Sequence, residues 1–88
     1  MTTTRILRLP DVRARAGICR TTVYDRIARG TWTRGVKLGA RAVGWPKSEV
    51  EAIVAAHVAG WSEDQIRTLV DHLHASRATA VDHLLGAQ

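Results

Sequence analysis

Residues 18–30 read ICRTTVYDRIARG and decide the fold expected for this chain. Val23 and Ile27 lie four residues apart, so they share one face of a short helix. Gly30 can end that helix because glycine accepts a positive φ at low cost. Cys19 stands at the N-cap position, where sulfur accepts hydrogen bonds more weakly than a serine or threonine hydroxyl. The stretch therefore predicts a second helix after a tight turn.

A first helix precedes it. Pro10 suits the first helical turn, where a missing N–H costs nothing, and Gly17 supplies a stop. Two short helices joined by a glycine turn form a helix-turn-helix. Before Pro10, the alternation of polar and apolar residues over residues 5–9 predicts an edge strand. The apolar residues expected to pack together are Val12, Ala16, Ile18, Val23 and Ile27.

A β-hairpin is expected after the second helix. Residues 36–38 and 42–45 read as two strands around a turn at residues 39–41. Lys37 and Arg41 fall at or near its tip, where nothing apolar can cover them. A hairpin in this position is a wing, and a narrow minor groove attracts a guanidinium, so we expect Arg41 to contact DNA. The alternative is a solvated loop arginine.

Two further helices complete the predicted fold, which is mainly α with a small β-hairpin wing: a winged helix-turn-helix plus an extra C-terminal helix. The third helix starts near Pro46 and has its acids in the first turn, where the helix dipole favours them. Gly60 ends it, and Ser62 and Gln65 form a capping box for the fourth helix. The apolar stripe expected for the third helix is Val50, Ile53, Val54, His57 and Val58.

The fourth helix carries a stripe of its own. Its regular part is Ile66, Leu69, Val70 and Leu73, and Val81, Leu84 and Leu85 continue it less regularly. This stripe can pack on the winged domain or pair with a second subunit, and we favour a partner surface. Accordingly, we predict a DNA-binding domain over residues 5–59 and a helical extension over residues 60–88. That extension would support a homodimer or cooperative multimer on DNA.

Charge is distributed unevenly. The net charge is +5, but residues 1–47 hold eleven Lys or Arg against two acids, a net of +9. Residues 48–88 hold two Arg against six acids, a net of −4. A positive field concentrated on one half favours a polyanionic partner, most simply double-stranded DNA. A solvated basic surface is the alternative.

Helical geometry selects one face of the second helix as the reader. With Val23 inward, steps of about 100° per residue place Thr21, Asp25 and Arg29 outward, with Thr22 and Tyr24 flanking. The threonines lie in the first turn, where hydroxyls and backbone N–H groups can meet a phosphate. The candidate DNA-binding residues are Arg20, Thr21, Thr22, Tyr24, Asp25, Arg29, Lys37 and Arg41.

Several of these side chains have alternative roles. Arg20 and Arg29 are expected to bind phosphates. Tyr24 can contact a phosphate or a thymine methyl, or it can cover the small core. Asp25 cannot help a phosphate; it can accept from a cytosine amino group or repel the DNA backbone.

The chain also resembles a known family. The stretches that carry the resemblance are LPDV (9–12), GICRTTVY (17–24), IARG (27–30), VKLGARAVGW (36–45) and SEVEA (48–52). Together they resemble the AlpA family of small phage and prophage regulators, similar in fold to excisionases and to the winged helix of MerR-type proteins. The resemblance covers roughly residues 5–57. It implies that residues 19–29 form the major-groove helix, that residues 39–41 form the wing tip, and that the protein controls integrase genes or excision of integrated elements.

By position, the resemblance assigns Thr21, Thr22 and Tyr24 to exposed positions of the recognition helix and Arg41 to the wing. The chain departs from the family pattern at four places. These are Cys19, where serine is usual; Asp25, where a basic residue is common; and Thr33 and Gly35, which replace prolines.

Other chemistries find little support in the residues. One cysteine excludes an intramolecular disulfide and a four-cysteine metal site. His72 and His74 are two residues apart and would point away from each other on a helix, which argues against a metal, and His57 and His83 lie farther away. No glycine-rich phosphate loop or nucleophile with its base is present, so we expect no catalysis and no cofactor.

The chain has no apolar run of membrane-spanning length and no signal-peptide core, so we expect a cytoplasmic protein associated with DNA. Trp32, Trp45 and Trp61 are expected in core or interdomain packing, since the chain has no phenylalanine. The predicted function is sequence-specific binding of double-stranded DNA as a transcriptional regulator, an excision factor or both. The alternative is a protein-interaction module, such as an anti-repressor or an antitoxin-like partner.

Overall fold

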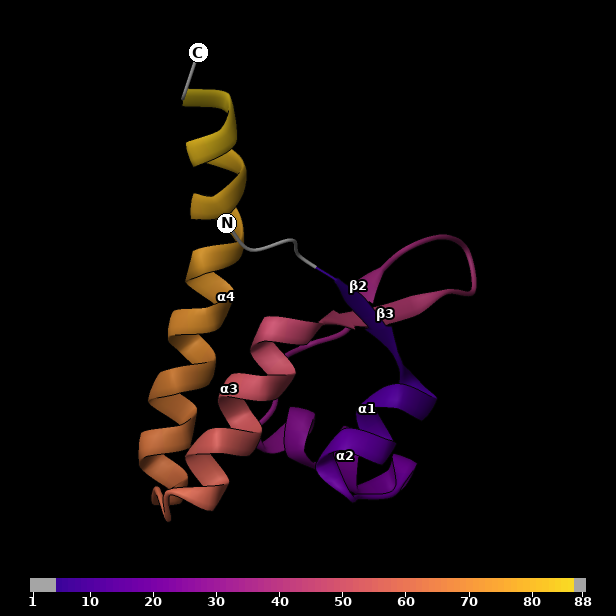
Figure 1. Ribbon diagram of the computed structural model, residues 1–88, viewed down its shortest axis with the longest axis vertical. Coiled ribbons are helices and arrows are strands. Elements are labelled where there is room, and N and C mark those ends of the chain that lie inside the picture. The colour runs from indigo at the N-terminus through magenta and orange to yellow at the C-terminus, as the bar shows by residue number, and fades with distance from the viewer. Residues whose placement is uncertain (1–4, 87–88) are drawn as a thin grey trace.

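The computed structural model describes residues 5–86, with side chains described over residues 5–78. The elements are β1 (Ile6–Arg8), α1 (Leu9–Ala16), α2 (Arg20–Arg29), β2 (Val36–Lys37), β3 (Val43–Pro46), α3 (Lys47–Val58) and α4 (Glu63–Gly86). Figure 1 shows α4 along one flank with α3 beside it, α1 and α2 on the other side, and the β2–β3 hairpin projecting away. The predicted mainly helical class is confirmed, and the arrangement is compatible with a winged helix-turn-helix followed by a C-terminal helix.

The helix-turn-helix forms as its glycines predict. Gly17 and Gly30 end α1 and α2 in the left-handed region, with φ of 69° and 80°. Cys19 is the N-cap of α2, and its sulfur makes no capping hydrogen bond of the kind that a serine or threonine makes there. Val12 and Val23 are fully buried between the two helices. Ala16, Ile18 and Ile27 are half-buried against the same core, so the predicted packing of this unit is confirmed.

A three-stranded antiparallel sheet joins this unit to the rest. β3 lies in the centre, with β1 and β2 on either side, so β1 is an edge strand as predicted. Leu7 pairs with Trp45 across β1 and β3, and both side chains are buried. The Trp45 indole Nε1–H donates to the carbonyl of Thr33 at 2.9 Å, so the buried ring also fixes the chain that leads into β2.

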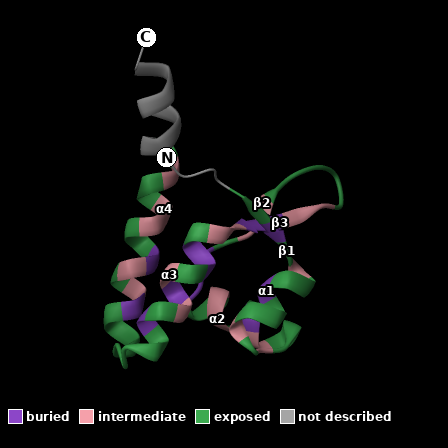
Figure 2. Ribbon diagram, viewed as in Figure 1, coloured by how far each residue is buried: buried purple, intermediate pink, exposed green. Residues whose placement is uncertain are grey.

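The hairpin is exposed along its loop. Within it, the Leu38 N–H donates to the Ala42 carbonyl at 2.8 Å and closes residues 38–42. Figure 2 shows this loop as exposed, whereas buried positions of α3 and α4 face each other. We call the β2–β3 hairpin with this loop the wing.

The apolar stripe of α3 differs from the prediction at its end. Val50 and Ile53 are fully buried, but His57 is exposed and Val58 is 84% exposed. Ala56 and Glu49 face inward instead. Residues 49, 53 and 56 are spaced three to four apart, so they share the face that α4 covers. The buried face of α3 is therefore rotated from the predicted stripe toward Glu49 and Ala56, because the packing of α4 decides which side of the helix is covered.

The tryptophans divide in a similar way. Trp32 and Trp45 are core residues, as predicted. The same prediction for Trp61 is wrong, because 45% of this residue is exposed. It follows Gly60, whose φ of 78° turns the chain outward between α3 and α4.

α4 begins at the predicted capping box. The Gln65 N–H donates to Ser62 Oγ at 3.2 Å, and the Ser62 N–H donates to Gln65 Oε1 at 2.8 Å. Ile66 and Val70 are buried in the core that also contains Val12 and Val23, and Leu69 and Leu73 are half-buried against it. The preference for a partner surface on this part of the stripe is therefore wrong, since α3 already covers it. The side chains of Val81, Leu84, Leu85 and His83 lie outside the described ones.

A buried ion pair ties α4 to α3. Glu49 is 5% exposed, and its carboxylate accepts two bonds from Arg77, Nε to Oε2 at 2.8 Å and Nη2 to Oε1 at 2.7 Å. Arg77 Nη2 also donates to the carbonyl of Arg34 at 2.7 Å. The N–H of Arg34 donates in turn to His74 Nε2 at 3.1 Å. The acid that the sequence predicts in the first turn of this helix is thus also a buried anchor.

Replacing Arg77 by methionine should test this anchor. Arg77→Met keeps an unbranched apolar stem but leaves the Glu49 carboxylate buried and unpaired. The free energy of unfolding in urea should fall by about 3 kcal/mol, the low end for loss of one partner of a buried pair, because Arg77 is partly exposed.

Lys47→Met is the matched control, because Lys47 pairs with the exposed Glu51 on the same helix at 3.9 Å. It should change stability by less than about 0.5 kcal/mol. Equal losses in the two variants would show that burial adds nothing to the Glu49–Arg77 pair.

Stability should also depend on the protonation of His74. Burial, followed by the nearby charges of Arg34 and Arg77, lowers the pKa of His74 from its ordinary value of 6.5. The neutral ring accepts the Arg34 N–H, and protonation removes that acceptor. Because the folded-state pKa is depressed, this stabilisation is complete above pH 6.5 and is lost as the pH falls through the folded-state value.

Urea unfolding at about pH 7.5 and about pH 5 measures this effect, since those values bracket the histidine titration. The parent should lose more stability between them than His74→Gln, whose amide oxygen can accept the Arg34 N–H at both values. His72→Gln, at an exposed position two residues away, should behave like the parent. Identical pH dependence in all three proteins would contradict this role of His74.

Candidate nucleic-acid interface

The first half of α2 faces the wing through an aromatic side chain. Tyr24 is 43% exposed and meets the buried Trp45 edge-on, with ring centroids 6.4 Å apart at 67°. The guanidinium of Arg20 lies over the Tyr24 ring, 5.6 Å from its centroid. Tyr24 therefore covers part of the core, as one of its two predicted roles requires, while the rest of the ring faces solvent beside a cation; its contact with DNA stays a prediction.

A hollow between α2, β1 and the wing places two more cations near Tyr24. It is lined by Arg8, Leu9, Pro10, Tyr24, Arg41, Val43 and Trp45. Arg8 Nε donates to the carbonyl of Val43 at 3.1 Å, so this arginine bridges from β1 to the base of the wing. Tyr24 and Arg41, seventeen residues apart in sequence, share this hollow. Sequence reasoning missed Arg8; the signal was its outward position in an edge strand directly before the first helix.

The wing carries its charges as predicted. Lys37 lies in β2 opposite Val43, and Arg41 lies in the loop; both are exposed. Within the part of the chain whose side chains are described, neither makes an ion pair with an acid. Both cations are therefore available to an anionic partner.

The two threonines at the start of α2 differ. Thr21 is exposed, whereas Thr22 is half-buried and its Oγ1 lies 3.2 Å from the Sγ of Cys19. The Thr22 hydroxyl, then the N–H groups of this turn, lower the pKa of the Cys19 thiol. Thr22 thus helps to close the helix start, and Thr21 is the hydroxyl presented outward.

The second half of α2 carries an ion pair that sequence reasoning overlooked. Asp25 Oδ2 lies 3.1 Å from Arg29 Nε, and both side chains are more than half exposed. The four-residue spacing of opposite charges was the available signal. The acid on this face therefore has a partner within the helix, and Arg29 is partly neutralised before any ligand arrives.

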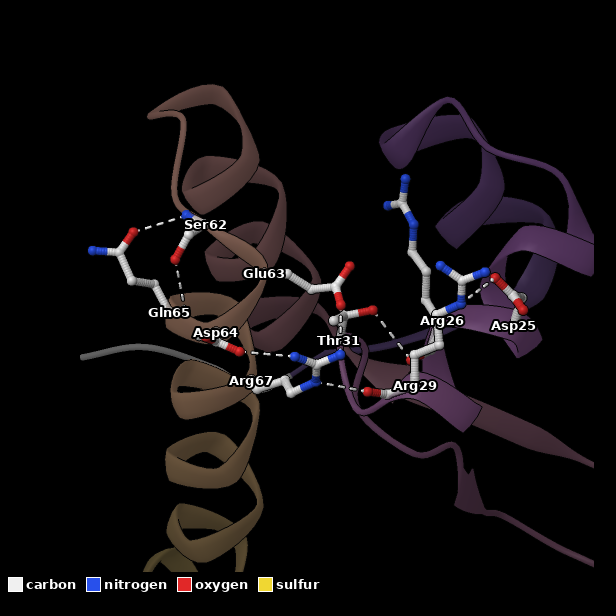
Figure 3. A network of polar contacts seen from close by, with 9 residues as sticks. All are labelled: Asp25, Arg26, Arg29, Thr31, Ser62, Glu63, Asp64, Gln65 and Arg67. Carbon is white, nitrogen blue, oxygen red and sulfur yellow. Dashed lines mark hydrogen bonds and ion pairs between the residues drawn. The ribbon is translucent and has the colours of Figure 1, made fainter.

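Asp25 and Arg29 border a different hollow from Tyr24. It lies between the end of α2, the end of α3 and the start of α4, and its lining includes Arg26, Thr31, His57, Trp61 and Glu63. Figure 3 shows Arg26 and the paired side chains of Asp25 and Arg29 on α2, with Glu63 and Arg67 of α4 on the other side of the view. Arg26 Nη1 lies 3.5 Å from His57 Nε2. Burial of the ring is the larger cause that lowers the pKa of His57, and the positive charge of Arg26 lowers it further.

The predicted site residues thus fall into two groups. Arg20, Tyr24 and Arg41 gather with Arg8 on the side of α2 that faces the wing, without an acid among the residues that line that hollow. Asp25 and Arg29 lie on the side that faces α4, where Glu63 adds a second carboxylate. Thr21 lies exposed in the first turn of α2. The cations between α2 and the wing therefore have no carboxylate beside them in that hollow, whereas Arg29 has two nearby.

Two other findings bear on chemistry. Among the described residues, no three His, Cys, Asp or Glu side chains gather closely enough to hold a metal ion. No helix in the described range is both long and apolar enough to cross a membrane.

Comparison with known proteins places the chain in a family. The family model "Prophage CP4-57 regulatory protein (AlpA)" matches residues 5–66, which include the helix-turn-helix, the wing, α3 and the start of α4. The chain is 40% identical over 60 residues to "Uncharacterized protein ORF88" of Enterobacteria phage P4, covering 68% of each chain. No solved structure matches. The chain is a member of the AlpA family of phage regulatory proteins.

Proposed function

We propose that this regulator binds double-stranded DNA in a sequence-specific manner, with α2 in the major groove and the wing against the adjacent backbone or minor groove. The observation that carries the proposal is the gathering of three arginines near Tyr24: Arg20 lies over its ring, and Arg8 and Arg41 line the same hollow as Tyr24. These cations come from three separate elements, and a polyanion that spans α2 and the wing would contact all of them. The net charge of +9 over residues 1–47 supports the same partner.

The geometry suggests how the contacts divide. Thr21 lies outward in the first turn of α2, where a recognition helix meets base edges and phosphates. Arg20 and Arg41 are placed for phosphates or a narrow minor groove. Arg29 would meet a phosphate with its charge already partly neutralised by Asp25. No catalytic step belongs to this proposal; the protein marks or bends a site for other proteins.

The bound site would act in transcriptional control, in excision of an integrated element, or in both. DNA recovered with the protein from its source genome separates these roles: sites beside promoters support the first, and sites flanking an attachment sequence support the second. Self-association through the distal part of α4 would strengthen binding at repeated sites.

A gel shift with random duplex DNA at two salt concentrations tests the proposal. Binding should occur at about 50 mM salt and weaken steeply by about 200 mM, because each neutralised phosphate releases counterions. Absence of binding at low salt, or binding that salt does not weaken, would contradict the proposal and favour the protein-interaction alternative.

Arg41→Ala should lower affinity for every duplex and reduce the slope of log K against log salt by about one unit, as loss of one phosphate contact does. Arg15→Ala removes the same charge from an exposed position on α1 that borders α3 rather than the wing. Its slope should stay near that of the parent. If the two slopes fall equally, the wing is not the point of contact.

Asp25 offers a test of the α2 face. Asp25→Asn removes a carboxylate from the exposed surface of α2, beside the expected DNA contacts, and frees Arg29 from its ion pair. Affinity for random duplex at low salt should rise by about two- to fivefold, the range expected for an exposed charge interaction of ~0.4–1 kcal/mol.

Asp71→Asn makes the same charge change at an exposed position on α4 and should leave the affinity nearly unchanged. Equal gains in Asp25→Asn and Asp71→Asn would mean that only net charge matters and that α2 does not meet DNA.

A further inference from the structure

The segment between α2 and the wing is held at both ends by α4. At the first end, Arg67 Nε donates to the carbonyl of Arg29 at 3.0 Å. The last carbonyls of a helix have no partner within it and lie at the negative end of the helix dipole. A guanidinium from another helix therefore caps α2 at its C-terminus. Figure 3 shows Arg67 reaching from α4 to this carbonyl.

Arg67 is itself fixed in direction by its own helix. Its Nη1 donates to Asp64 Oδ1 at 2.9 Å, and its Nη2 bonds Glu63. Both terminal nitrogens of Arg67 are held by carboxylates in the first turn of α4, so Nε is the nitrogen that donates to the Arg29 carbonyl of α2. The guanidinium holds these three acceptors with three separate nitrogens in one plane, whereas an ammonium would have to bring all three acceptors to a single nitrogen.

The second end is held in the same way. Arg77 Nη2 donates to the carbonyl of Arg34, while Glu49 holds the guanidinium in place, and His74 accepts the Arg34 N–H. Arg34 lies two residues before β2, so this contact sets where the wing begins. Arg67 and Arg77 lie ten residues apart on one helix and bind carbonyls at the two ends of residues 29–34.

The middle of the segment is also immobilised. Trp32 and Thr33 are buried, and the Trp45 indole holds the Thr33 carbonyl. The segment therefore follows a path that α4 and β3 determine jointly. α2 and the wing are connected through it, and the helix that fixes its ends is α4.

We propose that α4 sets the distance and angle between α2 and the wing through Arg67 and Arg77, which act as positioning residues for recognition of the DNA sequence without touching the DNA. This inference rests on the proposed DNA binding. Base contacts require the reading helix at a fixed position, whereas phosphate contacts tolerate small shifts. Loss of either contact should therefore weaken discrimination between sequences more than affinity for DNA in general.

The experiment uses Arg67→Lys and Arg77→Lys in the full chain, because lysine keeps the charge but cannot bind two carboxylate oxygens and a carbonyl as a planar fork. Kd is measured for random duplex and for a site that the parent selects from a random library. Each variant should raise Kd for the selected site about tenfold, the scale of one misplaced base contact. Kd for random duplex and the salt slope should stay at the parent values.

Arg15→Lys is the matched control and should change neither constant. Urea unfolding gives the folded fraction of each variant, and partial unfolding would raise both Kd values by the same factor. If the ratio of Kd for random duplex to Kd for the selected site stays at the parent value, the inference is overturned. A reduced salt slope would also overturn it, since it would place Arg67 or Arg77 on a phosphate.

DNA binding by the unsubstituted protein distinguishes failure of the positioning role from failure of the proposed DNA binding. If the parent binds random duplex and the ratio is unaffected in the variants, DNA binding stands and the positioning role falls. If the parent binds no duplex, both fall together.

Discussion

The guanidinium of Arg77 joins three parts of this small protein that are far apart in sequence. It binds the buried carboxylate of Glu49 on α3 and the carbonyl of Arg34 before the wing, and it belongs to α4. A carboxylate that is 5% exposed is costly unless it is paired and hydrogen-bonded. The position of α4 therefore follows from the need of Glu49 for a cation, and the base of the wing follows from the position of α4.

Because of this dependence, the C-terminal helix α4 is a structural part of the domain. By its composition it reads as an acidic extension to a domain that could close without it. In the structure, Ile66 and Val70 belong to the main core, and Arg67 caps α2. The helix thus contributes apolar area and two backbone caps, and it contributes them at the two ends of the segment between α2 and the wing. In this way a chain of 88 residues orders the short helix α2 and an exposed hairpin without a disulfide.

The charged residues around α2 divide between the side that faces the wing and the side that faces α4. Cations gather where β1, α2 and the wing meet, whereas Glu63 of α4 lines the hollow at the far end of α2 together with Arg26 and Arg29. Asp25 fits this arrangement, because it pairs with Arg29 on the side that faces α4 and leaves the side with Tyr24, Arg20 and Arg41 positive. Much of this site could be predicted from spacing and charge. The outward position of Arg8 in an edge strand did not distinguish it from the other exposed arginines, because only the pairing of β1 with β3 brings it to the wing.

The sequence by itself determined the local elements: two glycines that end α1 and α2, the capping box of Ser62 and Gln65, and the hairpin after α2. These depend on backbone conformation and on neighbours within a few residues, which the order of the residues contains. Only the tertiary structure decided that Glu49 is buried, that Trp61 is exposed, and that Arg67 and Arg77 hold carbonyls about 40 residues away in sequence. Whether a charged or aromatic side chain faces inward depends on which element packs over it, and hydrophobic periodicity alone cannot show that.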